Sequence, residues 1–495
     1  MRVVVSAGFV GQTPMPTSDT GWARQTRSFA TLTVTTLLIA LPSCDPGDLV
    51  RRPVLPTAMS GELVVVSRSA PTTRFVGADG AYSGLEQDML ELFSKESNLR
   101  LTVVERSRFS DVIPAVTQGV AHLAAAGLSV TEERAQKVTF GPSYMTARKT
   151  VAYNTSQRRP RGLEGLVGKR GGVLRGTSSA ARLRAEAKQL RGLKWDEIHA
   201  ADVDQLLDRL SAGKLDYVVS DSHVIELARN FYPNISIAFS FGEPEPIAWV
   251  LPKDAEPELV DQISVFFETI KRDGTLSILI DRYFGHVKRL NRMDIVAFLS
   301  RRETVLPRYA PMFKEAQDLT GIDWRLLAAL GFQESHWRPL ATSPTGVRGL
   351  MMLTSVTADE MGVKNRLDPH EAILAAGRYF LSIKERLPPR IREPDRTWLT
   401  LASYNVGLGH VYDARILARR QKLNPDLWIN VRKVLPLLAR SEYHSKLKYG
   451  FARGGEAVVL TENVRNYYDI LKRHEAPHTS VLDTLASSPA SLDEP

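Results

Sequence analysis

The sequence predicts a multidomain protein in which an α/β domain is followed by an all-α domain. Between residues 61 and 287, short runs of β-branched residues alternate with amphipathic stretches of helical length, a pattern typical of α/β domains. From about Met293 these strand-like runs disappear, and apolar residues recur at helical spacing to about Leu471. A chain of 495 residues has room for two or three domains of ordinary size.

The first 44 residues have the layout of an export signal. The apolar run 29–41 follows Arg24 and Arg27, is too short to span a bilayer, and leads into Leu-Pro-Ser-Cys. This ending resembles the lipobox of bacterial lipoproteins, which implies that Cys44 carries the lipid and begins the mature protein. Residues 45–60, with three prolines, are then expected to form a linker.

Composition limits the classes of partner. With 43% hydrophobic and 24% charged residues, the chain fits a globular protein and not a multi-span membrane protein. A single cysteine excludes an internal disulfide and a zinc site built on several thiolates, and we expect neither metal nor cofactor. Beyond residue 44, 61 basic and 54 acidic residues leave a net charge of +7, which suits an acidic polymer. No nucleic-acid-binding motif is recognisable, so we expect no nucleic acid partner.

The α/β domain is predicted over residues 61–287. Its strand-like segments are 63–66, 101–104, 151–153, 172–174, 217–219 and 247–251. Because helical patterns separate them, we expect a largely parallel sheet. The all-α domain is predicted over residues 288–475, with a proline-rich break at 387–394. Residues 476–495 are polar and rich in serine, which predicts a disordered tail.

One helix of the all-α domain presents a carboxyl on an apolar face. Asp323 is a suitable N-cap for a helix from Trp324 to about Ser335. On this helix Glu334 follows Leu327 by seven residues and Leu330 by four, so it shares their face. An apolar site disfavours the charged form of a carboxyl, raises its pKa and suits a general acid that works near neutral pH.

Four motifs in a fixed order carry a family resemblance. Gln-Glu-Ser-His-Trp at 333–337 is followed by the glycine-containing stretch 341–352, by Ala-Ser-Tyr-Asn-Val-Gly at 402–407 and by Thr-Glu-Asn at 461–463. Together they resemble the soluble lytic transglycosylase family over residues 300–470, and its membrane-bound members most. The resemblance implies a lysozyme-like helical fold and the cleavage of peptidoglycan glycan strands, whose stem peptides make them an acidic polymer.

The resemblance also implies a mechanism with one carboxyl. A retaining glycosidase with its own nucleophile needs a second carboxylate about 5 Å away, whereas substrate-assisted enzymes do not. The motifs offer no obvious aspartate partner for Glu334. By resemblance, Glu334 acts first as acid and then as base, and the cut sugar is N-acetylmuramic acid closed into a 1,6-anhydro ring.

Further residues of the site follow from the same resemblance. Ser343, Tyr404 and Asn405 match positions that line the groove beside the acid, and Glu462 matches one near the N-acetyl group. Met351 is expected to contribute apolar wall. The flexible residues Gly346 and Gly349 would let the backbone approach a sugar closely.

The α/β domain resembles the family 3 solute-binding proteins of amino-acid importers. The resemblance rests on the stretches 127–134, 176–178 and 215–221, covers residues 61–287 and implies a two-lobed, periplasmic-binding-protein-like fold. It implies that Arg134 holds a ligand carboxylate, that Asp221 holds an ammonium group, and that Ser129 and Thr177 donate further bonds, with Thr177 at a helix N-terminus. An amino acid or a murein peptide is the expected ligand. The alternative is a scaffold without ligand, with Arg134 and Asp221 in surface ion pairs.

The sequence leaves two other functions open. A lysozyme-type murein hydrolase would cleave the same bond with water, and a non-enzymatic solute-binding lipoprotein would carry an inactive helical domain. We expect a lipid-anchored protein of the cell envelope that faces the periplasm. We expect the outer membrane, although Asp45 resembles an inner-membrane retention signal of some bacteria.

Overall fold

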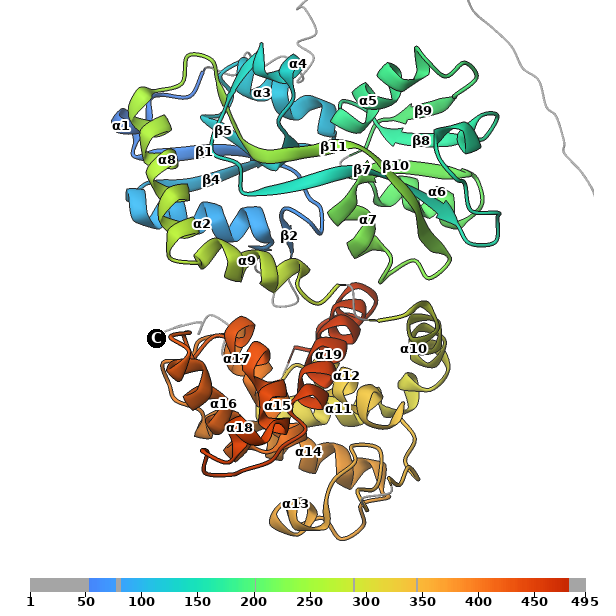
Figure 1. Cartoon of the computed structure of the whole chain (residues 1–495), viewed down its shortest axis with the longest axis vertical. Helices are drawn as coiled ribbons and strands as arrows, with labels where there is room; N and C mark the ends of the chain where they lie inside the picture. Colours follow the sequence, from blue (N-terminus) through green and yellow to red (C-terminus); the bar gives the residue numbers. More distant parts are fainter. Residues whose placement is uncertain (1–52, 77–81, 201, 288–289, 344–345, 480–495) are drawn as a thin grey trace, which may run out of the picture. The chain divides into compact units, whose positions relative to one another are not determined.

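The computed structural model describes residues 53–76, 82–200, 202–287, 290–343 and 346–479 (Figure 1). The predicted signal with Cys44 and most of the predicted tail lie outside these residues. Within them, none of the helices is long and apolar enough to cross a membrane. The same residues contain no group of three or more His, Cys, Asp or Glu side chains that could hold a metal ion.

The N-terminal α/β domain is built on one mixed sheet. The strand order is β4-β1-β5-β11-β7-β10-β8-β9, and β6 also pairs with β11. The bounds are β1 Glu62–Ser67, β4 Arg100–Glu105, β5 Leu123–Ser129, β6 Val138–Phe140, β7 Met145–Asn154, β8 Gly171–Leu174, β9 Trp195–Ile198, β10 Tyr217–Asp221 and β11 Ile235–Pro252. The six predicted strand segments all fall within these strands.

The sheet is parallel only toward its two ends. β1 pairs in parallel with β4 and β5, and β8 pairs in parallel with β9 and β10. The two long central strands, β7 and β11, run antiparallel to each other and to their neighbours. The prediction of a largely parallel sheet is therefore wrong in the centre, where β11 pairs with β5 of one half, β7 pairs with β10 of the other, and the two strands join the lobes (Figure 1).

Helices cover the sheet in each lobe. In the first lobe, α2 (Leu85–Ser97), α8 (Pro257–Arg272) and α9 (Thr275–Phe284) pack together over a core of aromatic residues that includes Phe93, Trp249 and Phe267. In the second lobe, α5 (Ser178–Ala187), α6 (Asp204–Ser211) and α7 (Ser222–Ala228) pack on β7, β8 and β10. The short α3 (Val112–Thr117) and α4 (Glu132–Ala135) belong to the first lobe.

The C-terminal domain is helical, as predicted. Its elements are α10 Arg292–Thr304, α11 Leu306–Thr320, α12 Trp324–Ser335, α13 Ser355–Glu360, α14 Pro369–Arg386, α15 Asp395–Val406, α16 Leu408–Arg420, α17 Trp428–Val434, α18 Ser441–His444 and α19 Gly454–His474. The central helix is α12, which packs against α11, α14 and α19 (Figure 1). Phe298, Phe313, Trp337 and Tyr467 are core residues around it.

Candidate active site

Helix α12 begins and ends as its sequence predicts. The Asp323 side chain accepts a bond from the Arg325 amide at 2.9 Å and caps the first turn. His336, with a φ of 54°, ends the helix in the left-handed conformation. Ten of the twelve helical residues are buried, so the helix lies inside the domain on nearly all sides. Only Gln333 and Glu334 are half-buried, which shows where α12 reaches the surface.

The Glu334 carboxyl is largely withdrawn from water. Burial raises its pKa to about 8. The carbonyl end of a helix carries partial negative charge, and the place of Glu334 in the last turn of α12 also disfavours its ionisation. Within the described part of the chain, no hydrogen bond or ion pair to this carboxyl is found. At neutral pH the group is therefore mainly protonated and can donate a proton.

Tyr404 and Met351 lie beside this helix end. The Tyr404 hydroxyl donates to the Met351 carbonyl oxygen at 2.9 Å. Burial, and after it the nearby Glu334 charge, raises the pKa of Tyr404 well above its usual value. The Met351 side chain is fully buried, and a Cβ at Gly331 would lie 2.9 Å from its sulfur. Met351 thus supports the helix from inside. Asn405, the next residue along α15, is exposed.

The loop after α12 is tied to the helix and folded on itself. The Ser335 hydroxyl, next to Glu334, donates to the Leu350 carbonyl oxygen at 2.7 Å. Ser343 is half-buried; its amide donates to the Val347 carbonyl oxygen at 3.0 Å, and the Val347 amide donates to the Ser343 hydroxyl at 3.3 Å. These bonds tie Ser343 to Val347 in the loop that follows the acid.

Gly349 allows a close approach, but the partner is the chain itself. Its φ is +87°, and an added Cβ would lie 1.8 Å from the Arg366 carbonyl oxygen. A side chain at this position would therefore separate the loop from the Arg366 backbone. The structure thus shows a packing contact at this glycine, and the approach to a sugar stays a prediction. At Gly346 nothing lies within 4 Å of an added Cβ.

Glu462 belongs to a separate ion cluster. It has no exposed surface, and its carboxylate accepts bonds from Trp428 Nε1 at 2.7 Å, Arg432 at 3.1 Å and Arg465 at 3.0 Å. Burial alone would raise its pKa, but Arg465 and the other two donors together lower it. No bond between Glu462 and Glu334 is found in the described part of the chain. The structure thus gives the two glutamates opposite environments.

The four predicted ligand residues of the α/β domain meet where the two lobes face each other. Arg134, on α4, is buried and donates to the carbonyl oxygens of Ser129 at 2.9 Å and Gly176 at 2.8 Å. Thr177 caps α5, where its hydroxyl accepts from the Ala180 amide at 3.2 Å. The prediction of a helix N-terminus at Thr177 is confirmed. Asp221 follows at the end of β10.

The sequence analysis missed Lys149. Its ammonium lies 2.6 Å from Asp221 Oδ1 and 3.3 Å from the Ser129 hydroxyl, so it joins two of the predicted residues. Asp221 is therefore in a buried ion pair and not in a surface pair. The sequence held a signal, because Lys149 alternates in phase with the buried Ala147 and Val151 of β7.

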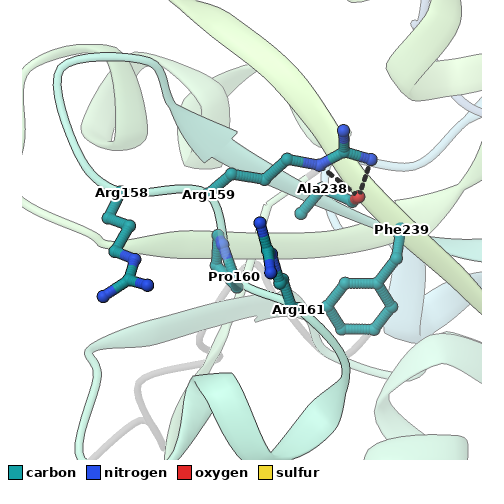
Figure 2. A pocket seen from close by; sticks show the side chains of 6 residues that line it. All are labelled: Arg158, Arg159, Pro160, Arg161, Ala238 and Phe239. Carbon is teal, nitrogen blue, oxygen red and sulfur yellow. Dashed lines mark hydrogen bonds between the residues drawn. The ribbon is translucent and has the colours of Figure 1, made fainter.

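A pocket of about 370 Å³ on the second lobe contains none of the predicted site residues (Figure 2). Three arginines at 158, 159 and 161 line it with Pro160, Ala238 and Phe239. The Arg159 guanidinium donates from Nε and Nη2 to the Ala238 carbonyl oxygen, the two bonds dashed in Figure 2. Arg159 thus fixes its own loop to β11.

Comparison with known families divides the chain as the structure does. Residues 63–286 match the family of bacterial extracellular solute-binding proteins, family 3. Residues 311–426 match the transglycosylase SLT domain. An ancestral arginine-binding protein solved with arginine is similar to 46% of the chain, with 26% identity, 99% of its own length covered and a TM-score of 0.43.

Similar full-length proteins carry both parts. The membrane-bound lytic murein transglycosylase F of Nitrosospira multiformis is 45% identical over 89% of this chain and 91% of its own length. The protein of the same name from Methylobacillus flagellatus is 43% identical over 91% of this chain and 95% of its own length. The similarity therefore includes both the α/β domain and the helical domain.

Proposed function

The chain belongs to the family of membrane-bound lytic murein transglycosylase F, and from this premise we propose that Glu334 is its catalytic acid and base. As a member of this family, the chain is a lyase that cleaves peptidoglycan strands and carries a solute-binding-like domain before its catalytic domain. The observation that carries the residue assignment is a desolvated carboxyl without a partner at the surface end of α12.

In the first step, the Glu334 carboxyl donates its proton to the glycosidic oxygen between N-acetylmuramic acid and N-acetylglucosamine. The bond from this oxygen to the anomeric carbon breaks as the carbonyl oxygen of the N-acetyl group bonds to that carbon. Burial favours this step because it keeps Glu334 protonated at the pH at which the proton is needed.

In the second step, the Glu334 carboxylate accepts the proton of the sugar's own C6 hydroxyl. The C6 oxygen then bonds to the anomeric carbon, the N-acetyl oxygen leaves, and a 1,6-anhydro ring closes. Glu334 returns to its protonated form and no water is consumed. A carboxylate in an apolar site is a strong base, so the same burial favours both proton transfers.

We further propose roles for the residues around the acid. Ser343, Tyr404 and Asn405 line the groove that holds the glycan strand, and Tyr404 fixes the wall through its bond to Met351. Glu462 is fully buried in its cluster. It would therefore act on the N-acetyl subsite through the position of α19 and not by direct contact.

Mass spectrometry of a peptidoglycan digest tests the reaction. We expect products that end in 1,6-anhydro-N-acetylmuramic acid, which are lighter by one water than the products of a hydrolase. Products with only reducing ends would identify a lysozyme-type hydrolase. Intact strands after exposure to the folded protein would favour a non-enzymatic lipoprotein.

The N-terminal domain, residues 61–287, is proposed to bind a small ligand of the amino-acid or murein-peptide class. The support is the meeting of Arg134, Ser129 and Thr177 between two lobes that β7 and β11 connect. A ligand can alter catalysis in residues 288–475 only if it binds two states of the protein with different affinity. Calorimetry with the Arg134→Ala variant as control tests the binding.

The protein is associated with the cell envelope, as the name of its family states. We propose that Cys44 carries the lipid that anchors it on the periplasmic side of the outer membrane. The Cys44→Ala variant is then expected in the soluble fraction after cell lysis, because one acyl-bearing residue supplies the anchor. Retention of the Ala variant in washed membranes would contradict this anchor, and the inner or outer membrane is resolved by density-gradient separation.

A further inference from the structure

Lys149 lies deep in the contact between the two lobes of the N-terminal domain. It belongs to β7, one of the two strands that pass between the lobes. Only 1% of its side chain is exposed. The preceding residue, Arg148, is exposed on the other face of the same strand. A buried ammonium must be paired, because an isolated one would cost several kcal/mol.

Four oxygen atoms surround the Lys149 ammonium. It donates hydrogen bonds to Asp221 Oδ1 at 2.6 Å, the Ser178 hydroxyl at 2.6 Å and the Ser129 hydroxyl at 3.3 Å. Glu245 Oε2 lies 2.8 Å away and forms an ion pair without a hydrogen bond. An ammonium has three N–H donors, so all of them are engaged. Ser129 comes from the first lobe and Asp221 from the second, and Lys149 therefore bridges the lobes.

This arrangement changes what Asp221 can bind. Burial by itself would raise the pKa of Asp221, but the Lys149 charge and hydrogen bond lower it below its usual value. The carboxylate is thus ionised and already paired with a cation of the chain itself. A second ammonium brought to the same oxygens would lie against Lys149, and two like charges at that distance repel each other.

Arg134 has a different position. Its guanidinium has five N–H donors and donates to two backbone carbonyl oxygens in the described part of the chain. No carboxylate oxygen lies within 4.0 Å of it in the described part of the chain. Asp221 and Glu245 act on it only at longer range. The buried Arg68 lies over the same Phe109 ring as Arg134, so two guanidinium groups gather there and would attract an anion.

We propose that Lys149 supplies from within the chain the ammonium group that a free amino acid would bring. The cleft then selects a carboxylate whose neighbouring nitrogen is acylated, which is the C-terminal end of a peptide. Arg134 binds the ligand carboxylate. Lys149, paired with Asp221, occupies the position in which the ammonium group of a free amino acid would lie. This inference rests on the proposed function of the domain as a ligand-binding module.

Calorimetry on the full chain in detergent tests the inference with matched ligands. The probes are the twenty amino acids of proteins and D-alanine. Each is tested as the free amino acid and as its Nα-acetyl derivative. We expect the parent protein to bind an acetylated compound at least tenfold more tightly than its free counterpart. The double variant Lys149→Met/Glu245→Gln keeps the charge balance and opens Asp221, so its preference should reverse toward the free amino acid.

Two controls keep the outcome unambiguous. Arg148→Met removes the same charge from the exposed face of β7 and should retain the parent preference, and thermal unfolding shows whether each variant folds. The inference is overturned, and the ligand-binding function stays intact, if the parent protein binds free amino acids as tightly as their acetyl derivatives and the double variant shows the same ratio of affinities. If the parent protein binds none of the compounds and only the double variant binds free amino acids, the end of a peptide is not the ligand. No heat with any compound in either protein removes both the inference and the function of the domain.

Discussion

Glu334 in the helical domain and Asp221 in the α/β domain are both withdrawn from water, yet their environments act in opposite directions. Burial raises the pKa of Glu334 to about 8, and no cation offsets it in the described residues. Asp221 has the buried Lys149 ammonium at 2.6 Å, which lowers its pKa. Burial without a partner yields a neutral acid that can transfer a proton, whereas burial with a tethered cation yields a fixed charge. Only the first arrangement suits an acid catalyst.

The largest expected effect is on catalysis. Glu334→Gln removes the acidic proton but keeps the size of the side chain, and loss of general acid–base catalysis costs about a hundred- to ten-thousand-fold in rate. Release of soluble fragments from purified peptidoglycan measures it. Glu360→Gln, an exposed site on α13, is the control. Cleavage by the Glu334→Gln variant within threefold of the parent would contradict the assignment.

The next effect is on the stability of the other region. Lys149→Met leaves Asp221 and Glu245 close together without their cation, which should lower the free energy of unfolding by about 3 kcal/mol. Arg148→Met should change it by less than about 0.5 kcal/mol. Urea unfolding at pH 7 compares the two variants. Equal stability of the Lys149→Met and Arg148→Met variants would show that the ion pair contributes nothing.

A smaller effect follows from the cost of keeping Glu334 desolvated. Its folded pKa of about 8 lies above the ordinary value of 4.5, so the folded state loses stability as pH rises from about 4.5 to 8. Glu334→Gln is neutral throughout. We expect it to unfold like the parent near pH 5 and to be more stable by about 2 kcal/mol at pH 9, after discounting for partial exposure. A difference that does not change with pH would contradict a raised pKa.

The smallest effect concerns Tyr404. Tyr404→Phe removes the bond to the buried Met351 carbonyl oxygen, which is worth about 1 kcal/mol. Peptidoglycan cleavage should fall by about tenfold or less, and the pH at which it declines should stay unchanged. A loss as large as that of Glu334→Gln would instead assign the proton transfer to the Tyr404 hydroxyl.

The sequence predicts local features of both regions well. The cap at Asp323, the length of α12 and the apolar face that Glu334 shares depend on residues within one helix. The strands follow from alternation over a few residues. These features need no knowledge of distant contacts.

The features that could not be predicted depend on residues far apart in the chain. Lys149 meets Asp221 across 72 positions, and Glu462 meets Trp428 across 34. No local pattern sets such distances. The antiparallel centre of the sheet also depends on how β7 and β11 pair over their whole length. Partners of this kind decide whether a buried carboxyl is neutral or charged.

The most direct test is the ionisation of Glu334 itself. NMR of the full chain with ¹³C-labelled glutamate carboxyl groups, with Glu334→Gln to assign the signal, gives its pKa without reference to activity. We expect a resonance that titrates near pH 8 and a parallel decline of peptidoglycan cleavage above that pH. A resonance that titrates near 4.5 would mean that Glu334 is ionised at neutral pH, and it would contradict the account of Glu334 as the proton donor.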